Sequence, residues 1–213
     1  MQFSGLSWRA INPLSVLRSL WCHRGLLLLM TKRSVQERYR GSMLGLLWVL
    51  SMPLLLLIIY TFVFSVIFKA RTGGELQSSK VAFAMTLFCG LTVYNIFSES
   101  LGAATSVIRG NQNYVKKVVF PLDILPVVGV LSAAFFGVAW FTILLLGLCV
   151  AMPQSLTVHA FCLPIVVVPL LFFCAGVAWF ISSMSVYIRD TQHAVDVFLR
   201  LLFFMTPIIY SID

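Results

Sequence analysis

The chain has 213 residues, of which 60% are hydrophobic and only 10% are charged, and its mean hydropathy is +0.99. Soluble domains hold about 45–50% apolar and about 25% charged residues, and a domain of this size leaves much of its surface in contact with solvent. So many apolar side chains can be accommodated only if the solvent is lipid. The composition therefore predicts an all-α fold, a polytopic membrane helical bundle, and excludes the soluble enzyme folds.

The charges are strongly unbalanced, with 15 Lys and Arg against 7 Asp and Glu and a formal net charge of +8. In a soluble protein this excess would suggest nucleic acid as a partner. Here seven of the bases precede the first long apolar segment, where the positive-inside rule and anionic lipid headgroups account for them. We therefore expect these basic residues to interact with membrane lipids and not with nucleic acid.

Residues 1–42 form the first predicted unit, a cytoplasmic N-terminal segment. Asn12 and Pro13 can begin a helix, and Trp21 belongs to a set of apolar residues that recur near helical spacing among basic ones. A basic helix with a tryptophan, too polar to span, lies in the headgroup plane. The pattern predicts an interfacial amphipathic helix in the region 13–30.

Residues 43–213 are predicted to form the transmembrane domain, since about 20 apolar residues suffice to cross the hydrocarbon. The stretch 124–188 holds 65 residues without a charge, which is too long for one span. We divide it at its most polar point, residues 152–155. The predicted spans are about 43–68, 81–105, 126–150, 158–188 and 195–212.

Basic residues are distributed unequally between the two sets of connections. The N-terminal segment, the 109–123 loop and the 189–190 turn hold eleven Lys and Arg, whereas the opposite side holds three. The positive-inside rule then places the N-terminus in the cytoplasm. After five spans, Asp213 would lie on the outer side of the cytoplasmic membrane.

Few residues in the sequence suggest chemistry. The five cysteines share no metal-ligand spacing, the three histidines lie in different segments, and no Walker motif is present. We expect no catalytic, cofactor-binding or metal-binding residues. Glu99 is a carboxylate inside a predicted span, and two interpretations stay open: a functional intramembrane acid, or an acid near a helix end, where charge is tolerated better.

Two predicted cytoplasmic segments are more specific. Residues 37–48 read ERYRGSMLGLLW, and residues 109–126 read RGNQNYVKKVVFPLDILP, a basic and amide-rich loop whose exit is stiffened by two prolines. Such a loop suits a rigid lever for a cytoplasmic partner. A solvated loop that obeys the positive-inside rule would have the same composition.

Four blocks, residues 38–68, 108–126, 185–196 and 201–211, resemble in order and spacing the permease subunit of ABC-2 type ABC transporters. The likeness is to the branch that exports O-antigen, capsular polysaccharide or teichoic acid. It implies a permease homodimer around a conduit for lipid-linked polysaccharide, with two ATPase subunits that bind ATP and Mg docked below. The family has six spans and an interfacial N-terminal helix, so this chain would lack the C-terminal end.

The resemblance also implies roles for individual residues. The loop between the second and third spans would be a coupling helix on the ATPase, which involves Arg109, Asn111, Tyr114, Lys116 and Lys117. The cytoplasmic entrance would include Arg38, Tyr39, Arg40 and Trp48. A conduit could be lined by Tyr60, Phe64, Tyr94, Phe97 and Glu99. Interfacial belts and lipid-facing packing explain most aromatic residues in spans equally well.

Three alternatives to polysaccharide export are left open. The first is an ABC-2 permease for a drug or small lipid, and the second is a multispan membrane enzyme that acts on lipid-linked sugar. The third is a structural membrane scaffold, which predicts neither a co-purifying ATPase nor turnover of a substrate. An exporter should co-purify with an ATPase, whereas an enzyme should turn over its substrate alone.

Overall fold

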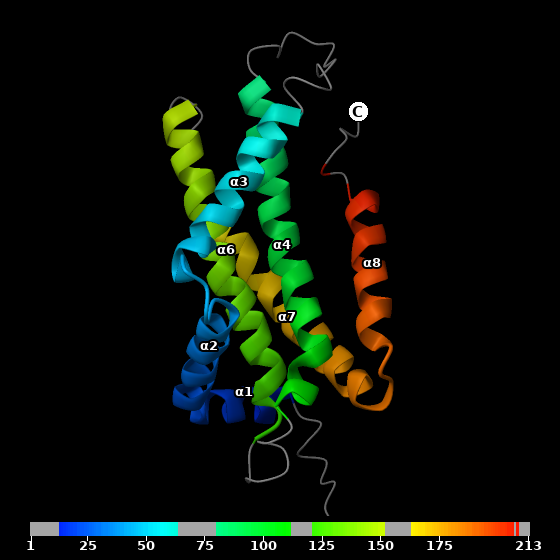
Figure 1. Ribbon diagram of the computed structural model, residues 1–213. Helices are drawn as coiled ribbons and strands as arrows, with labels where there is room; N and C mark the ends of the chain where they lie inside the picture. Colours follow the sequence, from blue (N-terminus) through cyan, green and yellow to red (C-terminus); the bar gives the residue numbers. More distant parts are fainter. Residues whose placement is uncertain (1–12, 64–79, 112–120, 152–162, 207, 209–213) are drawn as a thin grey trace, which may run out of the picture.

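The computed structural model describes residues 13–63, 80–111, 121–151, 163–206 and 208. These residues form seven α-helices and one 3₁₀ turn, and they contain no β-strand. In chain order the elements are α1 (Pro13–Cys22), α2 (Arg24–Arg38), η2 (Gly45–Leu47), α3 (Trp48–Phe62), α4 (Lys80–Gly110), α6 (Ile124–Ala151), α7 (Leu163–Tyr187) and α8 (Thr191–Met205). Helices α4, α6 and α7 form the centre of the bundle, while α2, α3 and α8 flank it (Figure 1). The predicted all-α fold is confirmed.

The N-terminal segment differs from the single interfacial helix predicted over 13–30. His23 separates α1, which lies across one end of the bundle, from α2, which runs along it (Figure 1). Leu27 and Val35 of α2 are buried, and Leu27 contacts a cluster on α6 that includes Ile124 and Val128. The two α2 residues are eight positions apart and therefore share one helix face. Because this face packs on α6, only α1 has the orientation expected of an interfacial helix.

A turn with two glycines joins α2 to α3. Gly41 has φ 87° and Gly45 has φ 49°, a left-handed conformation that glycine adopts without steric cost. The amide of Ser42 donates to the carbonyl of Tyr39 at 3.1 Å, and the amide of Gly45 donates to the carbonyl of Ser42 at 3.2 Å. Helix α3 consequently begins at Trp48, five residues after the predicted start of the first span.

The long helices α4 and α6 approach each other closely at glycines of α6. A Cβ on Gly129 would lie 3.1 Å from the Cβ of Ala103, and a Cβ on Gly137 would lie 2.5 Å from Cγ1 of Ile96. Small residues of this kind let membrane helices come together. Buried hydroxyls of α4 have hydrogen-bond partners within the helix: Ser100, for example, donates to the carbonyl of Ile96 at 2.7 Å.

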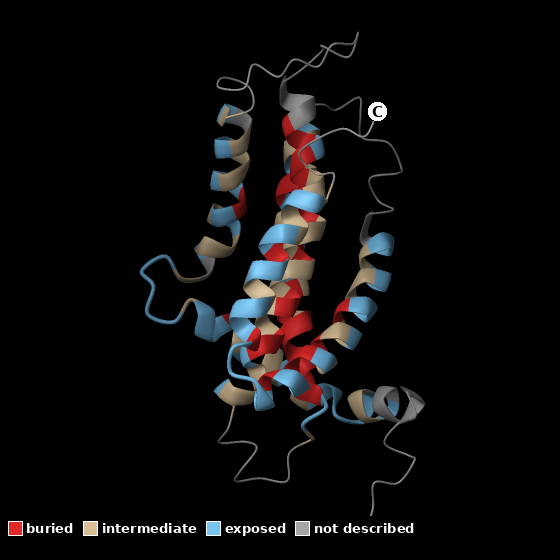
Figure 2. Ribbon diagram, turned by 90° about the vertical axis from the view of Figure 1, so that its right-hand side faces the viewer, coloured by how far each residue is buried: buried red, intermediate tan, exposed pale blue. Residues whose placement is uncertain are grey.

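The surface is more apolar than that of a soluble protein. Ile165, Phe172 and Phe180 of α7 are 69%, 67% and 70% exposed, and Figure 2 shows most buried residues on the central helices, with few on the flanking ones. Two described helices, 124–150 and 165–187, are long and apolar enough to cross a membrane, and 48–60 is a shorter apolar helix. Together with the composition, this identifies an integral membrane protein.

The helix ends differ from the predicted spans in several places. Helix α4 continues five residues past the predicted end at 105, α6 matches 126–150 within two residues, and α7 ends at 187 against the predicted 188. Residues 64–68 and 158–162 of the predicted spans lie outside the described residues. Helix α8 covers 191–205 where 195–212 is predicted. It ends because Thr206 is extended, at φ −79° and ψ 133°, as the residue before a proline prefers.

Candidate functional site

A pocket of about 800 Å³ opens between the α2–α3 turn and helices α3, α4 and α6. Polar side chains in its lining include Ser42, Asn95 and Ser98. Its aromatic side chains are Tyr39, Trp48, Phe136 and Trp140. The lining has two charged residues, Arg38 and Glu99, and contains neither His nor Cys. The arrangement is therefore suited to binding an amphipathic, charged ligand.

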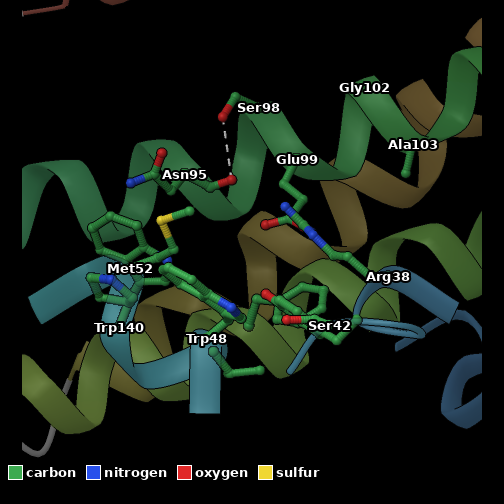
Figure 3. Close-up of a pocket in the computed structure, with 14 residues that line it drawn as sticks. Arg38, Ser42, Trp48, Met52, Asn95, Ser98, Glu99, Gly102, Ala103 and Trp140 are labelled. Carbon is green, nitrogen blue, oxygen red and sulfur yellow. Dashed lines mark hydrogen bonds and ion pairs between the residues drawn. The ribbon is translucent and has the colours of Figure 1, made fainter. Parts of the chain in front are cut away.

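Arg38 and Glu99 form an ion pair across the pocket, between the end of α2 and the middle of α4 (Figure 3). The Arg38 side chain is 52% exposed and that of Glu99 is 23% exposed. The guanidinium carbon of Arg38 also lies 4.5 Å from the ring centroid of Phe136. Tyr39 contacts the same Phe136 ring edge-on, with the centroids 5.9 Å apart.

The pocket face of α4 follows from helical periodicity. Asn95, Ser98, Glu99 and Gly102 line the pocket, and their spacing of three, four and seven residues places them on one helix face. The sequence interpretation selected only Glu99 from this face. Counting back one turn from Glu99 would have found Asn95.

Glu99 has a partner that the sequence did not reveal, because Arg38 is 61 positions away. Glu99 lies eleven residues before α4 ends at Gly110, which is about 16 Å at 1.5 Å per residue. Glu99 therefore does not lie at the end of α4, and it is not an acid without a partner. The structure places it part-way along α4, paired with a base from the N-terminal helices.

Three of the four residues predicted for the entrance come together in the pocket: Arg38, Tyr39 and Trp48. Arg40 does not line it. Arg40 is exposed and borders a separate hollow of about 380 Å³, together with Arg33, Gln36 and Glu37 of α2. The α2–α3 turn explains the difference, since it directs consecutive residues to different sides.

Of the residues predicted to line a conduit, Glu99 is the one that lies in the pocket. The hydroxyl of Tyr94 donates to the carbonyl of Leu199 in α8, and Phe97 stacks on Phe173 of α7 with centroids 6.3 Å apart. Both therefore belong to packing between helices: at 3.6 residues per turn, Phe97 lies nearly opposite Asn95 and Glu99 on α4, and Tyr94 lies to the side of them. Tyr60 is half-buried on α3 outside the pocket lining, and Phe64 lies outside the described residues.

The two ends of the predicted coupling loop are tied to α7 and to the turn after it. The guanidinium of Arg109 donates to the carbonyl of Arg189 at 3.5 Å, and the indole N–H of Trp179 donates to the carbonyl of Asp123 at 2.9 Å. The side-chain amide of Asn111 donates to the carbonyl of Val107 at 2.8 Å. The remaining predicted coupling residues, Tyr114, Lys116 and Lys117, lie outside the described residues.

Comparisons with known proteins agree on one family. A family model described as "ABC-2 type transporter" matches residues 25–213. An O-antigen export system permease protein, RfbA of Myxococcus xanthus, is 33% identical over 199 residues, which cover 93% of this chain and 73% of that protein. A protein of the same name from Klebsiella pneumoniae is 27% identical over 88% of this chain and 70% of its own length.

Proposed function

The chain belongs to the ABC-2 type transporter family, and we propose that it is the permease subunit of an ATP-driven exporter of lipid-linked polysaccharide in the bacterial cytoplasmic membrane. The observation that carries this proposal is its similarity, over 93% of its length, to a permease named for O-antigen export. The chain is a transport subunit and not an enzyme. ATP and Mg belong to a separate ATPase, and two copies of the permease enclose the conduit.

The end of the bundle that holds α1 supports this assignment. The α7–α8 turn and the ends of α4 and α6 that flank the 111–123 connection lie at the same end (Figure 1). Basic residues are concentrated there, among them Arg18, Arg24, Arg109 and Arg189. We propose that this is the cytoplasmic face and that the 111–123 connection contacts the ATPase. If the ATPase moves the 111–123 connection, the hydrogen bonds of Arg109 and Trp179 would transmit that movement to α7 and the turn after it.

The pocket fits a cytoplasmic entrance for the substrate. Arg38 supplies a cation, and Trp48 and Trp140 supply ring faces of the kind on which sugar rings stack. The pocket opens beside the α2–α3 turn, between the N-terminal helices and the membrane helices. A lipid-linked sugar approaching along the inner leaflet would meet these residues first.

Reversing charges in the coupling loop tests the proposed partner. In the variant Lys116→Glu/Lys117→Glu we expect the recovery of the ATPase that co-purifies with the permease to fall about tenfold, and more steeply as salt is raised, because interface charges govern association and its salt dependence. The matched control is Lys69→Glu/Arg71→Glu, two reversals in the connection at the opposite end of the bundle, which should leave recovery unchanged. Equal recovery and equal export by both variants would contradict the assignment.

A further inference from the structure

Arg38 and Glu99 are the two charged residues in a pocket otherwise lined by aromatic, aliphatic and neutral polar side chains, and they neutralise each other there. We propose that Glu99 is an internal competitor for Arg38: a phosphate group of the lipid-linked substrate displaces the Glu99 carboxylate and takes its place on the guanidinium. This inference rests on the proposed export function. It assigns the phosphate end of the substrate to one side chain and gives Glu99 a role in setting affinity.

The pair can be exchanged because it is only weakly held. Arg38 is 52% exposed, and ion pairs in contact with water stabilise a fold little because solvent screens them. The guanidinium presents a planar fork of donors that fits phosphate as well as carboxylate. A diphosphate carries more negative charge than the single carboxylate of Glu99, so it can compete for the same donors.

Arg38 is also held in place without Glu99. Its guanidinium carbon lies 4.5 Å from the ring centroid of Phe136, and Tyr39 contacts the same Phe136 ring edge-on. A cation over an aromatic face is attracted by the ring. The guanidinium therefore stays oriented toward the pocket when the carboxylate leaves, and this pre-organisation lowers the cost of binding a new anion.

The rest of the pocket suits the groups that follow the phosphate. Its volume of about 800 Å³ lies within the range of about 300–1,000 Å³ that small-molecule sites occupy. Trp48 and Trp140 lie beside the ion pair in Figure 3, with Asn95 and Ser98 near them. The ring faces suit a sugar or the first apolar units of the lipid, and the amide and hydroxyl suit sugar hydroxyls.

Direct binding of defined probes tests the inference without an ATPase. The full chain is placed in lipid nanodiscs, and equilibrium binding is measured for radiolabelled polyprenyl diphosphate, for the uncharged polyprenol and for inorganic diphosphate. We expect saturable binding of polyprenyl diphosphate, much weaker binding of inorganic diphosphate and none of polyprenol. Equal affinity for polyprenol would overturn the inference, because the phosphate would contribute nothing. Equal affinity for inorganic diphosphate would overturn its assignment to a lipid-linked ligand.

Two variants of the pair give opposite expected results. Arg38→Gln should weaken binding of polyprenyl diphosphate about tenfold or more, because the cation that the phosphate needs is gone. Glu99→Gln should strengthen it about three- to fivefold, as expected for removal of a weak competing ion pair. If the pair only joins α2 to α4, both substitutions break it and should change affinity in the same direction, which would overturn the inference.

The matched control is Arg33→Gln, which removes the same charge from the same helix. Arg33 pairs with Glu37 at 2.7 Å and is 53% exposed, but it does not line the pocket. It should leave affinity within twofold of wild type, and a tenfold loss would show that net charge rather than Arg38 decides binding. Thermal melting of each variant in the same nanodiscs confirms that the fold is retained. Failure of this inference is distinct from failure of the proposed function, because co-purification of the ATPase is measured separately.

Discussion

At Gly137, helix α6 comes so close to α4 that a Cβ would lie 2.5 Å from Cγ1 and 2.6 Å from Cδ1 of Ile96. We predict that Gly137→Ala destabilises the fold by about 1–3 kcal/mol, the usual cost of overpacking a core. Gly176→Ala is the control, since a Cβ there meets nothing within 4 Å and alanine favours the helix. Equilibrium unfolding in mixed micelles with increasing SDS measures both. Equal unfolding midpoints for the two variants would contradict the close contact between Gly137 and Ile96.

The same contact predicts a rescue. Ile96→Ala removes the atoms that the new Cβ would meet, so Gly137→Ala should cost less in that background than in the wild type. The difference between the two costs is the coupling energy, which for residues in contact is about 0.5–3 kcal/mol. Additive effects would show that the damage from Gly137→Ala arises elsewhere than at Ile96.

At the level of single residues, sequence motifs select side chains but not their contacts. Arg38, Tyr39 and Trp48, predicted for an entrance, and Glu99, predicted for a conduit, line one pocket, and their roles stay predictions. The ion pair was not foreseen, because a contact over 61 positions has no signature in helical spacing. Tyr94 was selected for its residue type alone, whereas the tertiary packing of α8 determines where its hydroxyl bonds.

At the level of elements, the helices were predictable, whereas several of their ends were not. Apolar length predicts a membrane helix directly, and this placed the helices now seen at 124–151 and 163–187. Apolar composition gives no signal where local geometry stops a helix: the left-handed Gly41 and Gly45 delay α3, and the proline at position 207 ends α8 at 205. Packing of the polar helix α2 on α6 was missed, because only Leu27 and Val35 are buried there.

The indole N–H of Trp179 in α7 donates a hydrogen bond to the carbonyl of Asp123, just before the start of α6. Trp179→Phe keeps an aromatic ring but removes the donor, so we predict faster hydrogen exchange of the amides of residues 124 and 125. The expected loss of stability is about 0.5–1.5 kcal/mol, typical of one hydrogen bond. Hydrogen–deuterium exchange with mass spectrometry measures this, with Trp21→Phe as the control because Trp21 is 72% exposed on α1. Unchanged exchange at 124–125 would show that the bond does not hold the helix start.

At the level of the whole molecule, the arrangement of small and large side chains is that of a protein dissolved in lipid. Large apolar side chains such as Phe172 and Phe180 face outward, while glycines and hydroxyl-bearing residues of α4 and α6 share the centre with buried apolar side chains such as Phe88. Close approach and internally satisfied hydroxyls hold such a bundle together where lipid provides no hydrophobic force between helices. Composition could predict the lipid environment, but not which helices meet, since all of them carry apolar faces.

The orientation of the bundle in the membrane, predicted from its charges, can be tested with single cysteines. Eleven bases against three predict that the end bearing α1 faces the cytoplasm. Cys22 is exposed at the end of α1, and Ser155 lies in the connection after α6, outside the described residues. With the other cysteines changed to alanine, a membrane-impermeant maleimide should label Ser155→Cys in sealed spheroplasts. It should label Cys22 only after permeabilisation. Labelling of Cys22 in sealed spheroplasts would show that the bundle has the opposite orientation. The pocket of Arg38 and Glu99 would then open away from the compartment in which ATP is hydrolysed.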